Sequence, residues 1–149
     1  MDAAIFFGVD IMRAYGGDCY FAPVKVSRYL PAWARVEEDE FNHTFVASYS
    51  MFKPDTQIVL VDTIIDTGKS IELALSVLPR KPIAVVALVV KTDKAAQSYT
   101  FRRHELDIHA SFFLKGDPWL VGYGCDDDGL MRGLPWIGVK YEEDGLDKN

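Results

Sequence analysis

The stretch from residue 58 to residue 70 constrains this chain more than any other, and it reads Ile-Val-Leu-Val-Asp-Thr-Ile-Ile-Asp-Thr-Gly-Lys-Ser. Its four leading apolar residues predict a short buried strand. The carboxylates Asp62 and Asp66 follow, and a Thr-Gly-Lys-Ser turn then opens an apolar-periodic segment, 71–78, that predicts a helix. The free backbone N–H groups and the dipole of such a helix can bind a phosphate. Because carboxylates accept hydrogen bonds from sugar hydroxyls, the stretch predicts a phosphosugar site.

Two other interpretations of this stretch remain open from the residues alone. A P-loop requires Gly-x-x-x-x-Gly-Lys-Ser/Thr, but here Thr63 stands at the first glycine position and Asp66 would lie inside the phosphate cradle. The other alternative is a strand-to-helix turn in which Asp, Thr and Ser are capping residues and no ligand binds.

Length and charge limit the classes of protein to which the chain can belong. Its 149 residues predict one compact domain spanning 1–149, because domains commonly hold about 100–150 residues. No apolar run reaches the ~18 residues of a membrane span, and the N-terminus lacks the basic region of a signal peptide. The net charge of −6 argues against a nucleic-acid partner, which normally requires a clustered basic face. Two cysteines, Cys19 and Cys125, are too few for a disulfide framework and fit a reducing cytoplasm.

Strand-like and helix-like segments alternate along the chain, which predicts an α/β fold with a parallel sheet covered on both faces. Ligands of such sheets bind at the carboxyl ends of the strands, so we expect Asp62, Asp66 and Lys91 to crowd that edge. Besides the strand and helix already described, the expected strands are 3–8, 44–49, 83–90, one or two within 112–123, and one within 134–141, and a further helix is expected over 19–30.

A second group of polar residues lies near the C-terminus, between residues 119 and 139. There an aromatic and a short strand precede a glycine-containing turn, three consecutive carboxylates at 126–128, and Arg132. Consecutive acids can hold Mg²⁺, and an arginine can bind a phosphate in a bidentate manner. The alternative is an acidic surface turn with an arginine nearby by chance.

Both stretches resemble one enzyme family. Residues 58–70 are similar to the phosphoribosyl-pyrophosphate (PRPP) signature of type I phosphoribosyltransferases: two acids, two apolar residues, then Asp-Thr-Gly-Lys-Thr/Ser. Residues 119–139 resemble the C-terminal part of hypoxanthine-guanine phosphoribosyltransferases, with Val-Gly-Tyr-Gly, an Asp two residues on, an Arg six further, and then Leu-Pro, an aromatic and Ile-Gly-Val. Together with Val-Val-Lys-Thr at 89–92, the resemblance covers about 58–139. It implies a type I phosphoribosyltransferase-like fold, a mainly parallel sheet flanked by helices with a small hood from the terminal segments.

The resemblance also implies an activity. Enzymes of this family transfer the ribosyl 5-phosphate of PRPP to a purine base and release pyrophosphate, which makes a nucleoside monophosphate in purine salvage. The resemblance therefore implies a 6-oxopurine acceptor (hypoxanthine, guanine or xanthine), Mg²⁺, a cytoplasmic location, and assembly as a homodimer or homotetramer. Neither a membrane nor a nucleic acid is expected as a partner.

Site residues follow from the resemblance, position by position. Residues implied to bind the ribose and the 5-phosphate of PRPP are Asp62, Thr63, Asp66, Thr67, Gly68, Lys69 and Ser70. Residues implied at the purine are Lys91, which donates to its O6, Trp119, which stacks on it, and Leu120, through its backbone. Residues implied near pyrophosphate are Tyr15, Gly16 and Arg132. Asp66 is also the implied general base, Asp126 and Asp62 are the implied metal ligands, and Cys125 is expected to pack in the interior. Two alternatives stay open: Lys91 as a surface lysine at a strand end, and Trp119 as a core residue.

The chain departs from the family pattern in two places. The signature usually has two adjacent acids before its apolar pair, whereas this chain has Asp62 followed by Thr63. The family also carries a long mobile loop that closes over the site, whereas here only residues 50–57 separate Ser48-Tyr49 from the PRPP stretch. A rival hypothesis is therefore a non-catalytic PRPP- or nucleotide-binding regulatory protein on the same fold.

Overall fold

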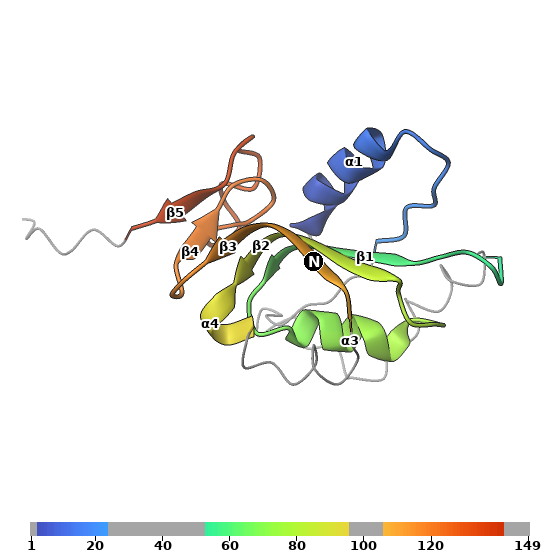
Figure 1. Cartoon of the computed structure of the whole chain (residues 1–149). Helices are drawn as coiled ribbons and strands as arrows, with labels where there is room; N and C mark the ends of the chain where they lie inside the picture. Colours follow the sequence, from blue (N-terminus) through green and yellow to red (C-terminus); the bar gives the residue numbers. More distant parts are fainter. Residues whose placement is uncertain (1–2, 24–52, 96–105, 142–149) are drawn as a thin grey trace, which may run out of the picture.

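The computed structural model of the chain describes residues 3–23, 53–95 and 106–141. At its centre lies a three-stranded parallel sheet in the order β1-β2-β3. The strands are β1 (Val59–Ile65), β2 (Ala84–Lys91) and β3 (Ile108–Leu114). Helix α1 (Ala4–Tyr15) lies over one face of this sheet and helix α3 (Lys69–Val77) over the other (Figure 1). The parallel, two-sided α/β architecture expected from the sequence is therefore confirmed.

The two strands β1 and β2 are rich in valine, isoleucine and leucine, as expected for strands covered on both faces. They pair in register, with Leu60 opposite Val85 and Ile65 opposite Val90. Apolar side chains of α3 close the core on one face of the sheet: Ile71 and Ala74 are fully buried. The core cluster comprises Leu60, Ile65, Ile71, Ala74, Val85, Ala87 and Val90.

The strand expected over residues 3–8 is wrong, because these residues begin α1. A short apolar run cannot by itself distinguish a strand from a buried helix segment. Over a longer window the helical period is clear, since Ala4 and Gly8, four residues apart, are buried. The helix ends at Gly16, which adopts the left-handed conformation (φ 65°) that commonly terminates helices.

The other expected elements agree with the structure to different degrees. The strand beginning near residue 58, the helix of 71–78 and the strand of 83–90 are confirmed as β1, α3 and β2, and β2 is followed by a single helical turn, α4 (Thr92–Ala95). The region 112–123 holds the end of β3 and all of β4 (Trp119–Val121), while 134–141 contains the short β5 (Gly138–Lys140). Residues 19–23 are not helical, so the first part of the helix expected over 19–30 is wrong. Pro23 has no N–H to donate, which disfavours a helix that continues through it. The strand expected over 44–49 lies outside the described residues.

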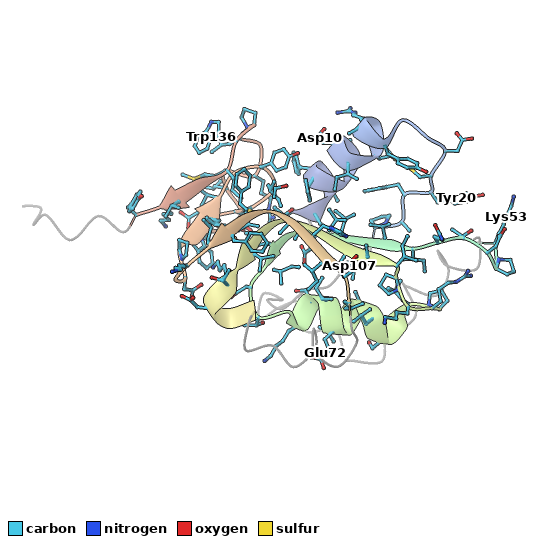
Figure 2. The ribbon with its side chains drawn as sticks, in the orientation of Figure 1. Asp10, Tyr20, Lys53, Glu72, Asp107 and Trp136 are labelled. Carbon is cyan, nitrogen blue, oxygen red and sulfur yellow. The ribbon has the colours of Figure 1, made fainter. Side chains whose placement is uncertain are left out.

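The C-terminal segment forms a small ribbon in which β4 and β5 pair antiparallel. It lies beside α1 (Figure 2), where the Tyr123 hydroxyl donates a hydrogen bond of 2.6 Å to Oδ2 of Asp10 and the rings of Phe6 and Tyr123 are 6.4 Å apart. The N- and C-terminal segments thus contact each other.

Across residues 3–23, 53–95 and 106–141, none of the helices has the length and apolar character needed to span a bilayer.

Candidate active site

The turn between β1 and α3 forms the first part of the site. β1 ends at Ile65, three residues follow, and α3 begins at Lys69. Gly68 is the N-cap, with φ 79° in the left-handed region that favours glycine. A hollow of about 30 Å³ lies in this turn, lined by Asp62, Asp66, Thr67, Gly68, Lys69, Ser70 and three neighbouring isoleucines. The first N–H groups of α3 have no intrahelical partner, so the turn can hold an anionic group.

This geometry excludes the P-loop alternative. Thr63, at the first glycine position of a P-loop, lies inside β1, so the loop that follows the strand is too short for a phosphate cradle of that kind. The N-cap of α3 is Gly68, which has no side chain and therefore makes no capping hydrogen bond of its own.

Asp62 is a buried carboxylate beside the hollow, with 6% of its surface exposed. The backbone N–H of Thr63 donates to its Oδ1 at 2.8 Å. Burial raises the pKa of Asp62 to about 6, and the Thr63 N–H offsets part of that effect. Thr63 itself is fully buried and does not line the hollow. Its side chain therefore does not join the other residues that were expected to bind PRPP.

Lys91 brings a positive charge to the same edge of the sheet. It is the last residue of β2, and the register pairs Ile65 with Val90, so Asp66 and Lys91 emerge at the same level. Lys91 is only 7% exposed, and its Nζ lies 2.7 Å from Oδ1 of Asp117. The alternative that Lys91 is a surface lysine is therefore wrong. Asp117 was not expected from the sequence, where only its position between Gly116 and Pro118 marks a turn.

The C-terminal loop supplies the remaining groups. Trp119 begins β4, with 57% of its surface exposed and its Nε1–H donating to the backbone oxygen of Asp126 at 3.2 Å. The alternative that Trp119 is a core residue is therefore wrong. Leu120 is buried, and β4 pairs it with Val139.

Asp126 is held on both of its carboxylate oxygens. Nη2 of Arg132 lies 2.7 Å from Oδ1 of Asp126, and the backbone N–H of Gly129 donates to Oδ2 at 2.8 Å. The Arg132 guanidinium also donates to the backbone oxygen of Gly124 at 2.7 Å, which closes the loop. Gly124 has φ 95°, and a Cβ added there would lie 2.4 Å from the backbone oxygen of Ala3, so only glycine fits.

Cys125 lies in the C-terminal loop, close enough to Asp62 of β1 for that charge to act on its thiol. The thiol is buried, as expected, and burial followed by the nearby charge of Asp62 raises its pKa to about 11. Smaller opposing effects on this pKa come from Arg132 and Lys91, and Asp126 adds to the increase. The charged groups of β1, β2 and the C-terminal loop therefore lie near one thiol, although they are far apart in the sequence.

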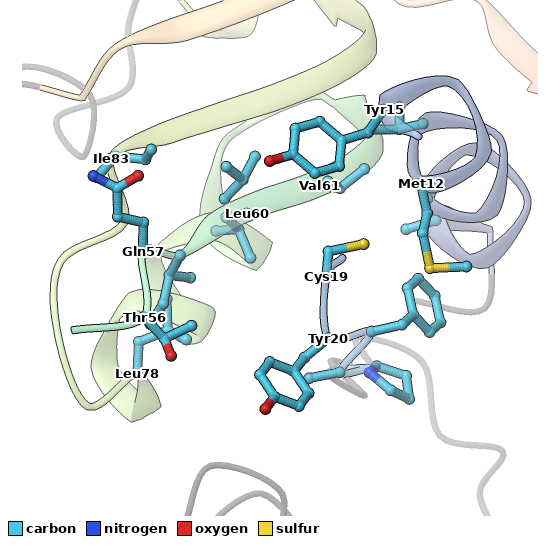
Figure 3. A pocket seen from close by; sticks show the side chains of 18 of the residues that line it. Met12, Tyr15, Cys19, Tyr20, Thr56, Gln57, Leu60, Val61, Leu78 and Ile83 are labelled. Carbon is cyan, nitrogen blue, oxygen red and sulfur yellow. The ribbon is translucent and has the colours of Figure 1, made fainter. Parts of the chain in front are cut away.

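Tyr15 and Gly16 lie elsewhere. Tyr15 lines a larger hollow of about 710 Å³ between α1, the loop that follows it and the beginning of β1 (Figure 3). Its neighbours there include Met12, Leu60 and Val61, and the walls are mostly apolar. Tyr15 is also 69% exposed. The structure therefore does not bring the residues expected near pyrophosphate together, because Arg132 lies in the C-terminal loop.

Two of these carboxylates fit a magnesium ion carried by a phosphorylated substrate. Mg²⁺ is usually held by one or two carboxylates together with substrate phosphates and waters, rather than by a cage of protein ligands. Asp126, whose side chain is 33% exposed, and Asp62, beside the phosphate turn, suit such an arrangement. Within the residues that the structure describes, no group of three or more His, Cys, Asp or Glu side chains is arranged to hold a metal ion.

Comparison with known proteins identifies relatives of this chain. No protein-family profile matches it. The hypoxanthine-guanine phosphoribosyltransferase of Mycoplasma genitalium is 36% identical over 93 residues, which cover 60% of this chain and 49% of the relative. The Staphylococcus aureus (strain Mu50) protein of the same name is 28% identical over 88 residues, covering 58% of this chain and 46% of the relative. The chain thus spans about half the length of the curated relatives it matches.

Solved structures of similar name are also found. A hypoxanthine-guanine-xanthine phosphoribosyltransferase is 28% identical with a TM-score of 0.44, covering 58% of this chain and 51% of the other. The hypoxanthine phosphoribosyltransferase of Trypanosoma cruzi, in complex with the product IMP, is 21% identical with a TM-score of 0.46, covering 62% and 50%. At these TM-scores the structural likeness carries no weight of its own, and the relationship rests on the sequences. Over about three fifths of its residues, this chain is similar in sequence to the hypoxanthine-guanine phosphoribosyltransferases.

Proposed function

We propose that this chain carries the active site of a purine phosphoribosyltransferase, which transfers the ribosyl 5-phosphate of PRPP to a 6-oxopurine and releases pyrophosphate. The observation that carries the proposal is the meeting of three features at one edge of the sheet. These are the phosphate turn at the start of α3, the buried Asp62 beside it, and Lys91 at the end of β2. Two of the motifs that carry the resemblance, 58–70 and 89–92, include these same features.

In this proposal the phosphate turn binds the 5-phosphate through backbone N–H groups of residues 67–70, and Asp62 accepts hydrogen bonds from the ribose hydroxyls. Breaking the bond between C1′ and pyrophosphate leaves positive charge on the sugar, which nearby carboxylates stabilise. The new bond joins C1′ to a purine nitrogen, and Asp66 accepts the proton that the base loses at N7. Such proton transfer typically contributes about 10²–10⁴-fold in rate.

The base and the leaving group are held by the other side chains. Lys91 donates to the purine O6, the exposed ring of Trp119 stacks on the base, and the backbone of Leu120 meets its edge. Arg132 and Asp126 contact the departing pyrophosphate in this proposal. Mg²⁺, bound through Asp126 and Asp62 together with the substrate, would neutralise charge on the departing pyrophosphate.

The test is a turnover assay of the purified chain with PRPP, Mg²⁺ and hypoxanthine, guanine or xanthine, in which nucleoside monophosphate formation is measured. We expect Asp66→Asn to lower kcat at least ~100-fold while thermal unfolding is unchanged. Asp55→Asn removes an exposed carboxylate at the other end of β1 and serves as the matched control. Near-normal turnover of Asp66→Asn would remove that residue from the mechanism.

One observation favours a second candidate, a PRPP- or nucleotide-binding regulatory protein without turnover. Thr63 provides no charge where the family signature has a second acid, and it is buried within β1 away from the hollow. Calorimetry separates the two functions: tight binding of PRPP and Mg²⁺ without ribosylation of any base would favour the regulator.

Assembly and location belong to the same proposal. A homodimer or homotetramer is proposed from the family resemblance, and light scattering of the purified chain tests it. A cytoplasmic location is supported by the free thiols of Cys19 and Cys125, which suit a reducing compartment. Measuring the thiol count in protein isolated from its own cells checks this location.

A further inference from the structure

The ion pair between Lys91 and Asp117 joins two residues 26 positions apart in the chain. The Lys91 side chain is 8% exposed, that of Asp117 is 55% exposed, and Nζ lies 2.7 Å from Oδ1. An ammonium group so nearly buried is costly unless acceptors receive its protons. A carboxylate that is mostly in water, in contrast, adds little to stability through such a pair. The pair therefore makes more sense as a means of orienting Lys91 than as a source of stability.

The turn that carries Asp117 is held against the end of β2 at two further points. Thr92 Oγ1 donates to the backbone oxygen of Leu114 at 3.1 Å. The N–H of Gly116 donates to Oδ2 of Asp93 at 2.8 Å. Gly116 has φ 77°, a conformation in which glycine reverses the chain without strain. Because Thr92 and Asp93 directly follow Lys91, the position of Asp117 relative to Lys91 is fixed by local bonds.

This arrangement restricts what the ammonium group can do. A lysine ammonium has three donors on a flexible four-carbon stem, so its direction is not set by the side chain alone. Once Asp117 occupies one donor, the remaining two point along defined directions. The same turn continues through Pro118 to Trp119, so the counter-ion of Lys91 and the exposed aromatic ring are two residues apart on one segment.

We infer that Asp117 is a positioning residue that aims the Lys91 ammonium at the 6-oxo group of the purine. Asp117 thereby sets the preference of the site for purines that carry this oxygen. The inference rests on the proposed function, because it takes the base to lie between Lys91 and Trp119. Asp117 itself touches neither the base nor the sugar in this arrangement.

The experiment compares inosine 5′-monophosphate with purine riboside 5′-monophosphate, which lacks the 6-oxo group and the N1 proton that accompanies it, by calorimetric titration of the full chain. We expect the wild-type chain to prefer the 6-oxo nucleotide. Asp117→Asn is expected to reduce that preference about tenfold, the scale of one hydrogen bond to a charged group, while affinity for the purine nucleotide stays the same. Asp117→Glu, which keeps the charge, is expected to restore most of the preference.

The matched control is Asp107→Asn, which removes the same charge from an exposed side chain at the opposite end of β3, where it pairs with His109 (Figure 2). This variant is expected to leave both affinities unchanged. Thermal unfolding of both variants is measured alongside, and we expect the two to unfold at similar temperatures.

Each contrary result has its own meaning. If the wild-type chain binds neither nucleotide, the proposed function is wrong and this inference falls with it. If it binds both but Asp117→Asn leaves the ratio unchanged, Asp117 does not position Lys91 and the proposed function stands. Equal losses for both nucleotides would show that Asp117 only maintains the fold, and equal wild-type affinities would show that Lys91 does not contact the 6-oxo group.

Discussion

Asp62 combines burial with a charge that the proposed chemistry needs. Its carboxylate is almost removed from water, and the backbone N–H of Thr63 donates to its Oδ1. Burial disfavours the ionised form and raises the pKa to about 6. Asp62, which is proposed to bind the sugar, therefore lowers the stability of the ligand-free protein near neutral pH. Functional sites commonly reduce stability in this way.

The pH dependence of this cost follows from the two pKa values. Below the ordinary value of 3.8, Asp62 is neutral in the folded and unfolded chain, so burial of its charge costs nothing. Between 3.8 and about 6 only the unfolded chain releases its proton, so the free energy of unfolding falls as pH rises. We expect Asp62→Asn to stabilise the chain by up to about 3 kcal/mol at pH 8 and to have little effect at pH 4.

Denaturant unfolding at the two pH values measures this difference, with Asp55→Asn as the control for an exposed carboxylate. A variant less stable than the wild type at pH 8 would show that hydrogen bonding, not burial, dominates at Asp62. In the same variant we expect weaker binding of PRPP, since Asn cannot supply the charge.

Trp119 gives a second prediction for a single residue. Its ring is exposed although one edge is tied to Asp126, which leaves a face free for stacking. Stacking of a base on an aromatic ring is worth about 1–3 kcal/mol. We expect Trp119→Ala to weaken binding of the purine base by that amount and to leave PRPP binding nearly unchanged, whereas Trp119→Phe retains most of the affinity.

Trp136, which is 54% exposed in the same C-terminal segment, is the control for removing an exposed tryptophan. Calorimetry with hypoxanthine and with PRPP separates the two effects. Equal losses for base and PRPP in Trp119→Ala would mean that the tryptophan supports the loop and does not stack.

At the scale of elements, hydrogen bonds hold the segment just before β1, and a tight turn follows the end of the strand. The Arg80 guanidinium, after α3, donates to the backbone oxygens of Lys53, Pro54 and Thr56, which lie just before β1. At the other end the chain turns within three residues into α3, through the left-handed Gly68. The strand, its turn and the helix therefore form one unit that holds the phosphate hollow in place.

Gly68→Ala tests this unit. An alanine at φ 79° is strained by roughly 1 kcal/mol, so we expect a similar loss of stability. We also expect at least a tenfold weaker affinity for ribose 5-phosphate, about 1.4 kcal/mol, because the N–H groups of the turn shift. Gly129→Ala, with φ 83° and open space around the added Cβ, has the same strain outside the turn and should retain ribose 5-phosphate binding.

Unfolding curves and calorimetry of both variants measure the two quantities. If Gly68→Ala binds ribose 5-phosphate as the wild type does, the hollow at α3 is not the phosphate site.

At the scale of the whole molecule, the terminal segments are joined by the hydrogen bond from Tyr123 to Asp10, which spans 113 positions. The bond holds the phenolic proton and raises the pKa of Tyr123 to about 12. Its stabilising effect is fully present below the ordinary pKa of 10 and is lost as pH rises through about 12. This bond connects α1 to the loop that carries Asp126 and Arg132.

We expect Tyr123→Phe to lower the free energy of unfolding by about 0.5–1.5 kcal/mol, the usual value of one hydrogen bond. In an ultraviolet pH titration, the tyrosine signal with the highest pKa should be absent in Tyr123→Phe. In Asp10→Asn that signal should appear at a lower pH. Tyr141→Phe, at a side chain 83% exposed, is the control. A titration in which the last tyrosine persists in Tyr123→Phe would contradict the assignment.

Local patterns in the sequence are sufficient to specify the unit of β1, the phosphate turn and α3, the buried strand β2, and the resemblance to the phosphoribosyltransferases. These patterns are runs of branched apolar residues, a glycine where a helix begins, and motifs in a fixed order along the chain. The candidate residues Asp62, Asp66, Thr67, Gly68, Lys69 and Ser70 can therefore be identified from the sequence alone.

The meeting of distant residues, in contrast, depends on the tertiary fold. The fold makes the run at 3–8 helical, pairs Asp117 with Lys91, places Tyr15 in a different hollow, and shifts the pKa of Asp62 by burial. Each of these depends on the path of the chain through space, since burial and long-range contacts arise from packing between elements. A local pattern specifies an element, whereas the surroundings of a side chain are set by elements from elsewhere in the sequence.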